Sequence, residues 1–197
     1  MRILFVPVSI DDYEKCPWGL TSDVHLFREA GNEVRIITKK NFWKFYFEYL
    51  RFKPDIVVST GVIAFIPSLF KKIGLLRKPL IHMWDDYYGE AMGKKWGSWP
   101  AYFEMFSILN ADYITTVSRY NETKAKNLGK KVIYIPHGVQ EKIKKTAVNL
   151  TGKVKIVYIG EQSEIKQTDK MILAANESDC DLYLFGKPNP EFQKIAS

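Results

Sequence analysis

Short apolar runs alternate with amphipathic stretches along the chain, and this alternation constrains the fold more than any other feature. The runs are rich in β-branched residues and are bounded by turn residues, which predicts strands. Their apolar residues do not alternate with polar ones, as expected for parallel strands that are buried on both faces. We therefore predict an α/β fold with a doubly wound parallel sheet through about residue 136. The predicted strands lie at 3–8, 34–38, 55–59, 79–84, 113–117 and 131–136.

The same pattern restarts after a polar, lysine-rich segment. Residues 137–152 show little periodicity, and we interpret them as a linker. Beyond the linker, a strand, a helix and a second strand make one β-α-β unit, and a unit of about 45 residues is too small to bury its own core. The predicted organisation is a first domain at 1–136, the linker, and an incomplete second domain at 153–197.

Composition narrows the class of function. The formal net charge of +7 favours anionic partners such as nucleic acid, acidic lipid or phosphorylated ligands. Because neither zinc-ligand spacing nor an aromatic ribonucleoprotein motif occurs, we expect no nucleic-acid partner. Three histidines and two distant cysteines predict no metal site. The longest apolar runs are far shorter than the roughly 20 residues of a membrane span, and two distant cysteines fit a reduced, cytoplasmic chain.

Residues 39–53 combine aromatic rings with positive charge. Seven of the eleven residues from Phe42 to Phe52 are aromatic, and the whole segment carries a net charge of +4. As a helix it would have one narrow polar strip, and its apolar arc would be roughly twice the 100° that one packing surface needs. Neighbouring helices that cover Trp43 and Phe47 would explain this surplus. Contact with an anionic membrane surface would explain it equally, because rings sit at the headgroup level while lysine and arginine meet anionic lipid.

A glycine, Gly19, separates the first predicted strand from the first predicted helix. Glycine lets a backbone approach a ligand closely, and the start of a helix offers N–H donors to a phosphate. A plain turn residue is the competing interpretation. The dinucleotide fingerprint G-x-G-x-x-G is absent, which disfavours a dinucleotide-dependent oxidoreductase.

The segment "ADYITTVSRYNETKAKNLG" followed by "KKVIYIPHGV" resembles glycosyltransferase family 4. In that family a strand ending in Val-Ser, a helix and a short strand precede Ile-Pro-Asn/His-Gly-Val. The segment "YIGEQSEIKQTDKMILAA" resembles the opening of the family's C-terminal domain, and "PWGLTSDV" sits where the family has its Gly-Gly loop. The resemblance spans the whole chain.

This resemblance implies a Rossmann-like first domain that binds the acceptor, and a second domain, incomplete here, that binds the nucleotide-sugar, in the GT-B arrangement. The implied function is the N-terminal part of a retaining glycosyltransferase that moves a sugar from a nucleotide-sugar to an acceptor. No metal or other cofactor is implied, because basic side chains and helix N-termini carry the diphosphate charge. The aromatic segment at 39–53 suggests a lipid-linked acceptor and peripheral contact with the inner face of a membrane. A non-catalytic acceptor-binding subunit of a two-chain transferase is the alternative.

The resemblance also implies roles for individual residues. Asp85, after the fourth predicted strand, corresponds to the catalytic side of the family's site, and Lys166 matches its phosphate-binding lysine. Gly19 would also face the donor phosphates. The residues predicted to line the acceptor side of the cleft are Gly19, His82, Asp86 and His137.

Each of these residues has a plainer structural explanation. Asp85 and Asp86 would merely cap a loop, His82 would be a hydrogen-bonded core residue, and His137 would belong to a turn before the linker. Because ligands of α/β folds bind at the carboxyl ends of parallel strands, we predict that Gly19, Asp85 and His137 line a single cleft there.

Three features depart from the family's pattern. Glu161 stands where an arginine usually helps to hold the diphosphate, and a carboxylate there repels it. Gln167 replaces the glycine that follows the lysine. The family's acidic Glu-x7-Glu segment would lie beyond Ser197. We therefore expect that residues 1–197 alone do not transfer sugar at a useful rate, because preorganised groups that stabilise the departing diphosphate are missing.

Overall fold

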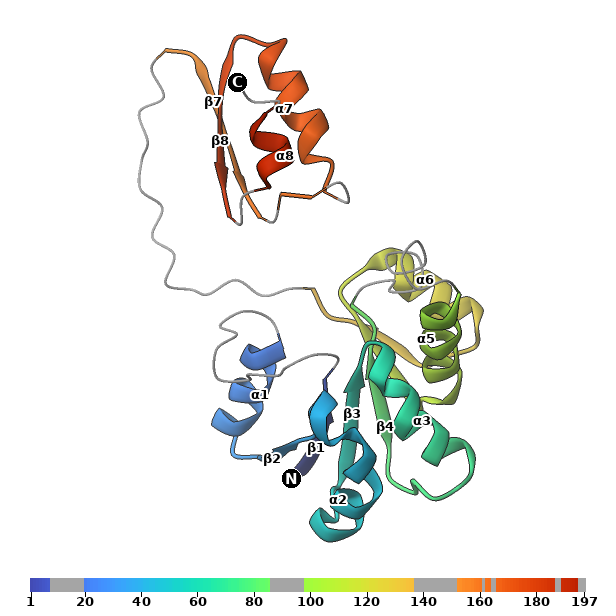
Figure 1. The fold of residues 1–197 in the computed structure, drawn as a ribbon. Coiled ribbons are helices and arrows are strands. Elements are labelled where there is room, and N and C mark those ends of the chain that lie inside the picture. The colour runs from blue at the N-terminus through green and yellow to red at the C-terminus, as the bar shows by residue number, and fades with distance from the viewer. Residues whose placement is uncertain are drawn as a thin grey trace. The chain divides into compact units, whose positions relative to one another are not determined.

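The computed structural model describes residues 1–7, 20–85, 98–136, 152–160, 162–163, 166–186 and 189–194. The chain divides into two compact units, Met1–Val139 and Gln140–Ser197. Figure 1 shows the sheet of the first unit with its helices, and the smaller second unit in orange and red. The division between the units falls within the segment 137–152.

Six parallel strands form the sheet of the first unit. Their order across the sheet is β2-β1-β3-β4-β5-β6, and each neighbouring pair is parallel (Figure 1). The predicted parallel sheet is confirmed, and the fifth strand pairs inside it. The strands are β1 (Arg2–Val6), β2 (Glu33–Ile36), β3 (Ile56–Thr60), β4 (Leu80–Met83), β5 (Tyr113–Thr116) and β6 (Val132–Tyr134).

Helices cover both faces of this sheet. Those in the described part of the first unit are α1 (Leu20–Glu29), α2 (Phe45–Phe52), α3 (Phe65–Lys72), α5 (Trp99–Asn110) and α6 (Arg119–Asn127). On one face, Val24 of α1 clusters with Ile3 and Phe5 of β1. On the other face, α2, α3, α5 and α6 enclose the larger core, which includes Phe45 and Ile108.

The change of face follows from the strand order. The chain moves outward from β1 to β2 and then returns across β1 to β3. Because crossovers between parallel strands are right-handed, the helices after this reversal lie on the opposite face from α1. The doubly wound fold is thus confirmed. The reversal also places a topological switch point between β1 and β3, where α/β folds bind ligands beyond the carboxyl ends of their strands.

The aromatic segment is two elements rather than one helix. A 3-10 helix, η2 (Lys39–Lys44), leads directly into α2. Lys53 then ends α2 in a left-handed conformation, with a φ of 50°, because the ring of Pro54 disfavours a helical residue before it. A second short 3-10 helix, η3 (Val62–Ala64), precedes α3 in the same way.

The rings of this segment divide between core and surface. Phe45 and Phe52 are 1% and 4% exposed, so they belong to the core. Trp43 and Phe47 are 64% and 71% exposed. Within the described residues, therefore, neighbouring helices do not cover Trp43 and Phe47, and the interpretation of complete internal packing is wrong for these two rings.

The second unit has a sheet that its own helices cover on one side. Two parallel strands, β7 (Val154–Ile159) and β8 (Cys180–Phe185), pack with α7 (Thr168–Asn176) and the short α8 (Pro190–Gln193). On the face away from α7, Val157, Ile159 and Phe185 are 56%, 80% and 55% exposed. The described part of this unit leaves much of its apolar surface unburied, and the interpretation of residues 153–197 as an incomplete domain stays a prediction.

A glycine closes the carboxyl end of this small sheet. Gly186 has a φ of 139°, and a Cβ there would collide with the carbonyl oxygen of Gly160. The chain after β7 and the chain after β8 can approach each other here only because position 186 carries no side chain.

No helix in the described residues is long and apolar enough to cross a membrane.

Candidate functional site

Asp85 lies at the edge of the sheet where the strands end. It follows Met83, the last residue of β4, by two positions, and its side chain is partly buried. The switch point between β1 and β3 is at the same edge, next to β4. Directly after β3, Gly61 adopts a φ of 64° and a ψ of −160°, a backbone conformation that is essentially restricted to glycine. The edge thus carries a partly buried carboxylate after β4 and, after the adjacent β3, a buried glycine in a conformation that other residues rarely adopt.

Trp84 holds the start of the Asp85 loop in place. Its backbone N–H donates to the carbonyl oxygen of Thr115 over 2.7 Å, and its own carbonyl oxygen accepts from Asn121 Nδ2 over 3.4 Å. The indole is 1% exposed, and its Nε1–H donates to Glu104 Oε1 over 3.2 Å. Trp84 is therefore bound to β5, α5 and α6 at once, which fixes the backbone immediately before Asp85.

His82 lies inside the larger core. Its side chain is 1% exposed, on the same face of β4 as Leu80 and Trp84. Its Nδ1 is 3.5 Å from Ser59 Oγ on β3. Burial lowers the pKa of His82 to about 4, and a hydrogen bond with Ser59 acts in the opposite direction. A neutral, enclosed imidazole has no direct contact with solvent, so a direct role for His82 in a cleft requires the core to open.

This burial predicts that the protein loses stability in mild acid. The pKa of His82 is 6.5 when unperturbed and about 4 when folded, so the unfolded chain binds more protons between these values. The free energy of unfolding should fall by about 3 kcal/mol as the pH drops from about 6.5 to 4, and the His82 contribution should then level off. Urea unfolding measured across this range checks the prediction.

A His82→Asn variant is the control for this titration. Asparagine keeps a polar partner for Ser59 but does not titrate, so the slope between pH 6.5 and 4 should disappear, whatever the absolute stability. Asp55 and Glu122, whose pKa values are lowered by hydrogen bonds from Arg2 and Lys126 respectively, act at lower pH. An unchanged slope in His82→Asn would assign the acid sensitivity to other groups.

Lys166 lies in the second unit, between β7 and α7. Its side chain is exposed, and its backbone N–H donates to the carbonyl oxygen of Ser163 over 3.1 Å. The next residue, Gln167, is the N-cap of α7 and has a left-handed backbone, with a φ of 52°. Glycine adopts this conformation without strain, which gives a physical reason for the glycine that the family carries here. Lys166 thus follows the carboxyl end of β7 at a helix N-terminus, and its contact with a phosphate stays a prediction.

Four residues of the predicted site fall outside the described residues. They are Gly19, Asp86, His137 and Glu161. The single cleft formed by Gly19, Asp85 and His137 therefore stays a prediction, of which the structure describes only the position of Asp85. In the described part of the chain, no group of three or more His, Cys, Asp or Glu side chains is arranged to hold a metal ion.

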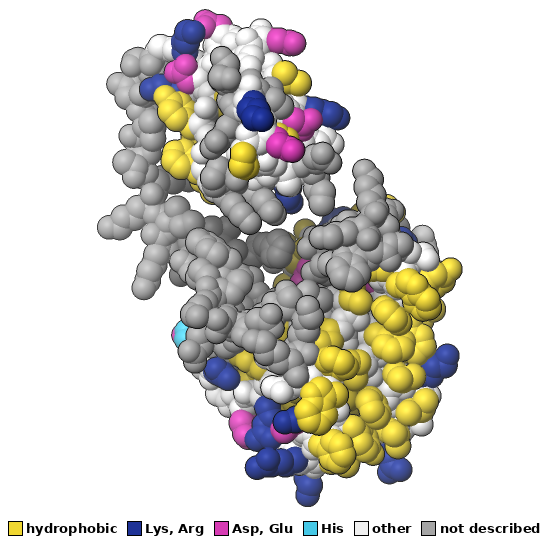
Figure 2. Space-filling model, viewed as in Figure 1, with side chains coloured by type: hydrophobic (Ala, Val, Ile, Leu, Met, Phe, Trp, Pro, Cys, Tyr) yellow, Lys and Arg dark blue, Asp and Glu magenta, His cyan; other side chains and the backbone are white. Residues whose placement is uncertain are grey.

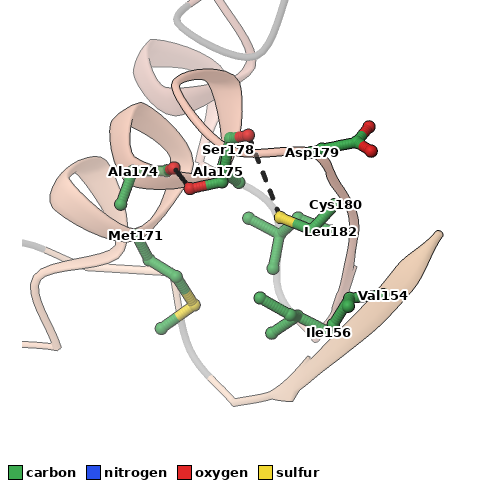
Figure 3. A pocket seen from close by; sticks show the side chains of 9 residues that line it. All are labelled: Val154, Ile156, Met171, Ala174, Ala175, Ser178, Asp179, Cys180 and Leu182. Carbon is green, nitrogen blue, oxygen red and sulfur yellow. Dashed lines mark hydrogen bonds between the residues drawn. The ribbon is translucent and has the colours of Figure 1, made fainter.

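A hollow in the second unit lies away from Lys166. It has a volume of about 360 Å³ and opens between α7 and the first halves of β7 and β8 (Figure 3). Figure 3 shows Met171, Ile156 and Leu182 turned into it, with Asp179 pointing outward. Because ligands of α/β folds bind at the carboxyl ends of the strands, this apolar hollow at the amino ends is core space of the unit rather than the predicted donor site.

Sequence reasoning missed the residues that support Asp85. Glu104 is the only acidic residue of the otherwise apolar α5, and a lone carboxylate in such a helix signals a buried polar partner. Asn121 and Gly61 gave no comparable signal. Glu104 and Gly61 lie outside the quoted family motifs. Asn121 lies inside one of them, but the motif alone does not indicate its role.

No protein-family model and no curated protein matches this chain. Among solved structures, the chain is similar to a crystal structure described as a UDP-N-acetylglucosamine 2-epimerase from Listeria monocytogenes. The TM-score is 0.51 and the sequence identity is 12%. The similarity covers 98% of this chain but 65% of the other, so this chain spans less than two thirds of that protein's length.

The fold class follows from the architecture and this similarity together. The strand order, the helices on both faces and the restart of the pattern in a second unit define a GT-B-like Rossmann fold. At 12% identity the likeness shows the fold alone. Glycosyltransferase family 4 remains a resemblance of motifs.

Proposed function

We propose that this chain is the N-terminal part of a retaining glycosyltransferase that moves a sugar from a nucleotide-sugar to an acceptor. The observation that carries the proposal is the position of Asp85: a carboxylate at the carboxyl edge of a GT-B-like sheet, on a backbone that Trp84 fixes. The motifs around Ser118 and Pro136, which resemble glycosyltransferase family 4, support the same function. The similar solved structure is described as a UDP-N-acetylglucosamine 2-epimerase, a name that indicates a UDP-sugar substrate. This supports a nucleotide-sugar as a substrate of the present chain.

Each unit takes one substrate in this proposal. The first unit binds the acceptor beside Asp85, whose carboxylate faces the positive charge that develops on the sugar. The bond between the sugar and the diphosphate breaks as the acceptor oxygen bonds to the same face of the sugar, and the departing diphosphate takes the proton of the acceptor hydroxyl. The second unit binds the donor, with Lys166 and the N-terminus of α7 compensating the charge of the diphosphate. No metal is needed for this compensation, and the substrates are the nucleotide-sugar and the acceptor.

The alternative is a non-catalytic acceptor-binding subunit of a two-chain transferase. The exposed sheet face around Val157, Ile159 and Phe185 favours some covering protein surface, which either further residues of the same polypeptide or a separate chain would provide. Both versions assign the acceptor to the first unit, so they differ only in where the rest of the donor site resides.

We further propose that the acceptor is linked to a lipid. The aromatic and basic segment at 39–53 exposes Trp43 and Phe47, and such rings favour the headgroup level of a membrane. The protein would then work in the cytoplasm, at the inner face of the membrane.

Depletion of the protein from an extract of its own cells tests the proposed function. An antibody removes the protein, and the extract then receives a panel of radiolabelled nucleotide-sugars and a membrane lipid extract. We expect that one sugar is no longer transferred and that purified protein restores its transfer. The product should keep the anomeric configuration of the donor, as for a retaining enzyme.

The same assay separates the alternatives. Transfer by purified residues 1–197 without extract would show that they form a complete enzyme, contrary to our expectation. Restoration by purified residues 1–197 that needs a second component of the depleted extract supports the two-chain form, because the antibody also removes any longer polypeptide. Restoration only by protein purified from the cells supports the longer polypeptide. Unchanged transfer of every sugar after depletion would refute the proposal, and so would isomerisation of a nucleotide-sugar without transfer.

A further inference from the structure

Exposed apolar side chains gather on the outer surface of α2, α3 and α5. Figure 2 shows hydrophobic side chains over a large part of this side of the first unit, with basic side chains around it. Phe47, Trp99 and Tyr102 are between 67% and 71% exposed. We name this surface the aromatic face and define it by exposed residues of the three helices and of η2: Trp43, Phe47, Leu50, Leu69, Trp99 and Tyr102.

Half-buried rings join the three helices beneath this face. Tyr46 of α2 stacks on Phe70 of α3, with 5.0 Å between the ring centroids and 4° between the planes. Phe65 of α3 lies 4.6 Å from Phe103 and 5.0 Å from Phe106, both of α5. The exposed side chains therefore rest on one packed layer. Continuous apolar patches of this kind mark sites of interaction with proteins or membranes.

The sequence segments that carry the aromatic face are rich in basic residues, of which Lys71 is paired with Asp112 over 2.6 Å. The segments 39–53, 62–78 and 98–110 together contain nine basic and two acidic residues. Both acids are engaged elsewhere: Glu48 pairs with Arg35 of β2 over 2.9 Å, and Glu104 is buried beneath Trp84. These three segments thus carry a net charge of +7, as large as that of the whole chain.

Two lysines lie directly against rings of this surface. Lys44 Nζ is 4.7 Å from the centre of the Trp43 ring, and Lys72 Nζ is 5.2 Å from the centre of the Phe106 ring. A lysine in this arrangement covers apolar surface with its methylene groups and keeps its ammonium group at the boundary between that surface and water. A boundary of rings and ammonium groups matches the interface of a bilayer, where the hydrocarbon lies beneath a layer of phosphates.

We propose that the aromatic face docks the protein on a lipid bilayer that contains anionic lipid. The inference extends the contact from segment 39–53 to three helices, and its link to sugar transfer rests on the proposed function. α5 runs back toward the start of β5, so its first residues, including Trp99, lie at the carboxyl edge of the sheet. The aromatic face therefore reaches the edge that carries Asp85, and docking brings a lipid-linked acceptor to that edge.

Sedimentation of the purified chain with vesicles tests this docking without any sugar. We expect binding to vesicles of phosphatidylcholine with phosphatidylglycerol, weaker binding to phosphatidylcholine alone, and loss of the difference at high salt. The pairs Trp43→Ser with Phe47→Ser, and Trp99→Ser with Tyr102→Ser, should each weaken binding by about tenfold or more. Replacing Lys44 or Lys72 by glutamine should weaken binding to the anionic vesicles by about fivefold each.

Two control variants separate the aromatic face from general surface effects. Leu26→Ser removes a side chain that is 58% exposed on α1, on the opposite face of the sheet, and Lys170→Gln removes an exposed charge in the second unit. Both should bind as the wild type does. Circular dichroism of each variant checks that the fold is kept.

Several results would overturn the docking proposal. They are a lack of binding to anionic vesicles, equal losses in the control variants, and self-association of the chain that the Trp43 and Phe47 pair abolishes in the absence of vesicle binding. The last result would assign the aromatic face to a second copy of the chain. Vesicle binding together with unchanged sugar transfer in depleted extract would leave docking intact and refute only the proposed function.

Discussion

Replacing Asp85 by asparagine is expected to lower the rate of sugar transfer by about 10²–10³-fold, the usual cost of removing one preorganised group that stabilises the charge of the transition state. Asparagine keeps the size of the side chain and its ability to accept a hydrogen bond, but it lacks the negative charge that faces the developing positive charge on the sugar. The loss should therefore appear in kcat, while the KM for the nucleotide-sugar changes little, because the donor is assigned to the other unit. Adding the variant to depleted extract measures both constants.

Asp181→Asn is the matched control for this experiment. Asp181 lies on β8 with an exposed side chain, so the same chemical change there should leave the rate unchanged. Thermal melting of both variants shows whether the fold is intact. A rate for Asp85→Asn within about threefold of the wild type, far short of the cost of losing a group that stabilises the transition state, would remove Asp85 from the proposed mechanism without affecting the proposed fold.

Replacing Trp84 by alanine is expected to lower the free energy of unfolding of the first unit by about 3–5 kcal/mol, the usual cost of truncating a buried aromatic residue. The indole is 1% exposed and belongs to the larger core. Its removal leaves a cavity and also takes one donor from the buried Glu104 carboxylate. Because the free energy of unfolding of a whole domain is only about 5–15 kcal/mol, this single change removes a large share of the stability of the first unit. Urea unfolding followed by circular dichroism measures it.

Trp84→Phe separates packing from hydrogen bonding at this position. Phenylalanine fills most of the space but lacks the N–H that donates to Glu104, so the expected loss is about 1–3 kcal/mol, the cost of an unmade buried hydrogen bond. A loss below about 1 kcal/mol in Trp84→Ala would contradict the packing described here. Since Trp84 precedes Asp85, the variant that keeps the fold should also lower sugar transfer by loosening the Asp85 loop.

The strands of the first unit were predictable because parallel strands buried on both faces consist of short, continuous apolar runs in the sequence. The run at 55–59 and the observed β3 at Ile56–Thr60 differ by one residue, since β-branched residues between a proline and a glycine suit no other buried element of that length. The helix predicted between the two strands of the second unit is observed as α7. The aromatic segment was harder, because the helical wheel assumes one regular helix and the chain instead begins with the 3-10 turn of η2.

For the candidate site, the sequence predicted which edge of the sheet carries the site, but it did not predict the side-chain contacts that support Asp85. Asp85 became a candidate because it follows the fourth predicted strand and because the family resemblance places it on the catalytic side, and its role stays a prediction. Its anchor, the hydrogen bond from Trp84 to Glu104, joins residues twenty positions apart on a strand and a helix, and no local pattern records such a pairing. The family motif pointed to position 167, yet only the backbone geometry revealed that Gln167 occupies a left-handed conformation there.

The amino-acid sequence by itself determined the parallel α/β architecture, the restart of the pattern after the linker and the surplus of rings and positive charge at 39–53, because each depends on residue types at short spacing. Only the tertiary structure decided which side chains meet solvent. His82 and Phe47 both occur in regular elements rich in apolar residues, yet His82 is 1% and Phe47 71% exposed. The difference arises because burial depends on which neighbouring strand or helix packs against each face, and the strand order that selects those neighbours is a property of the whole sheet.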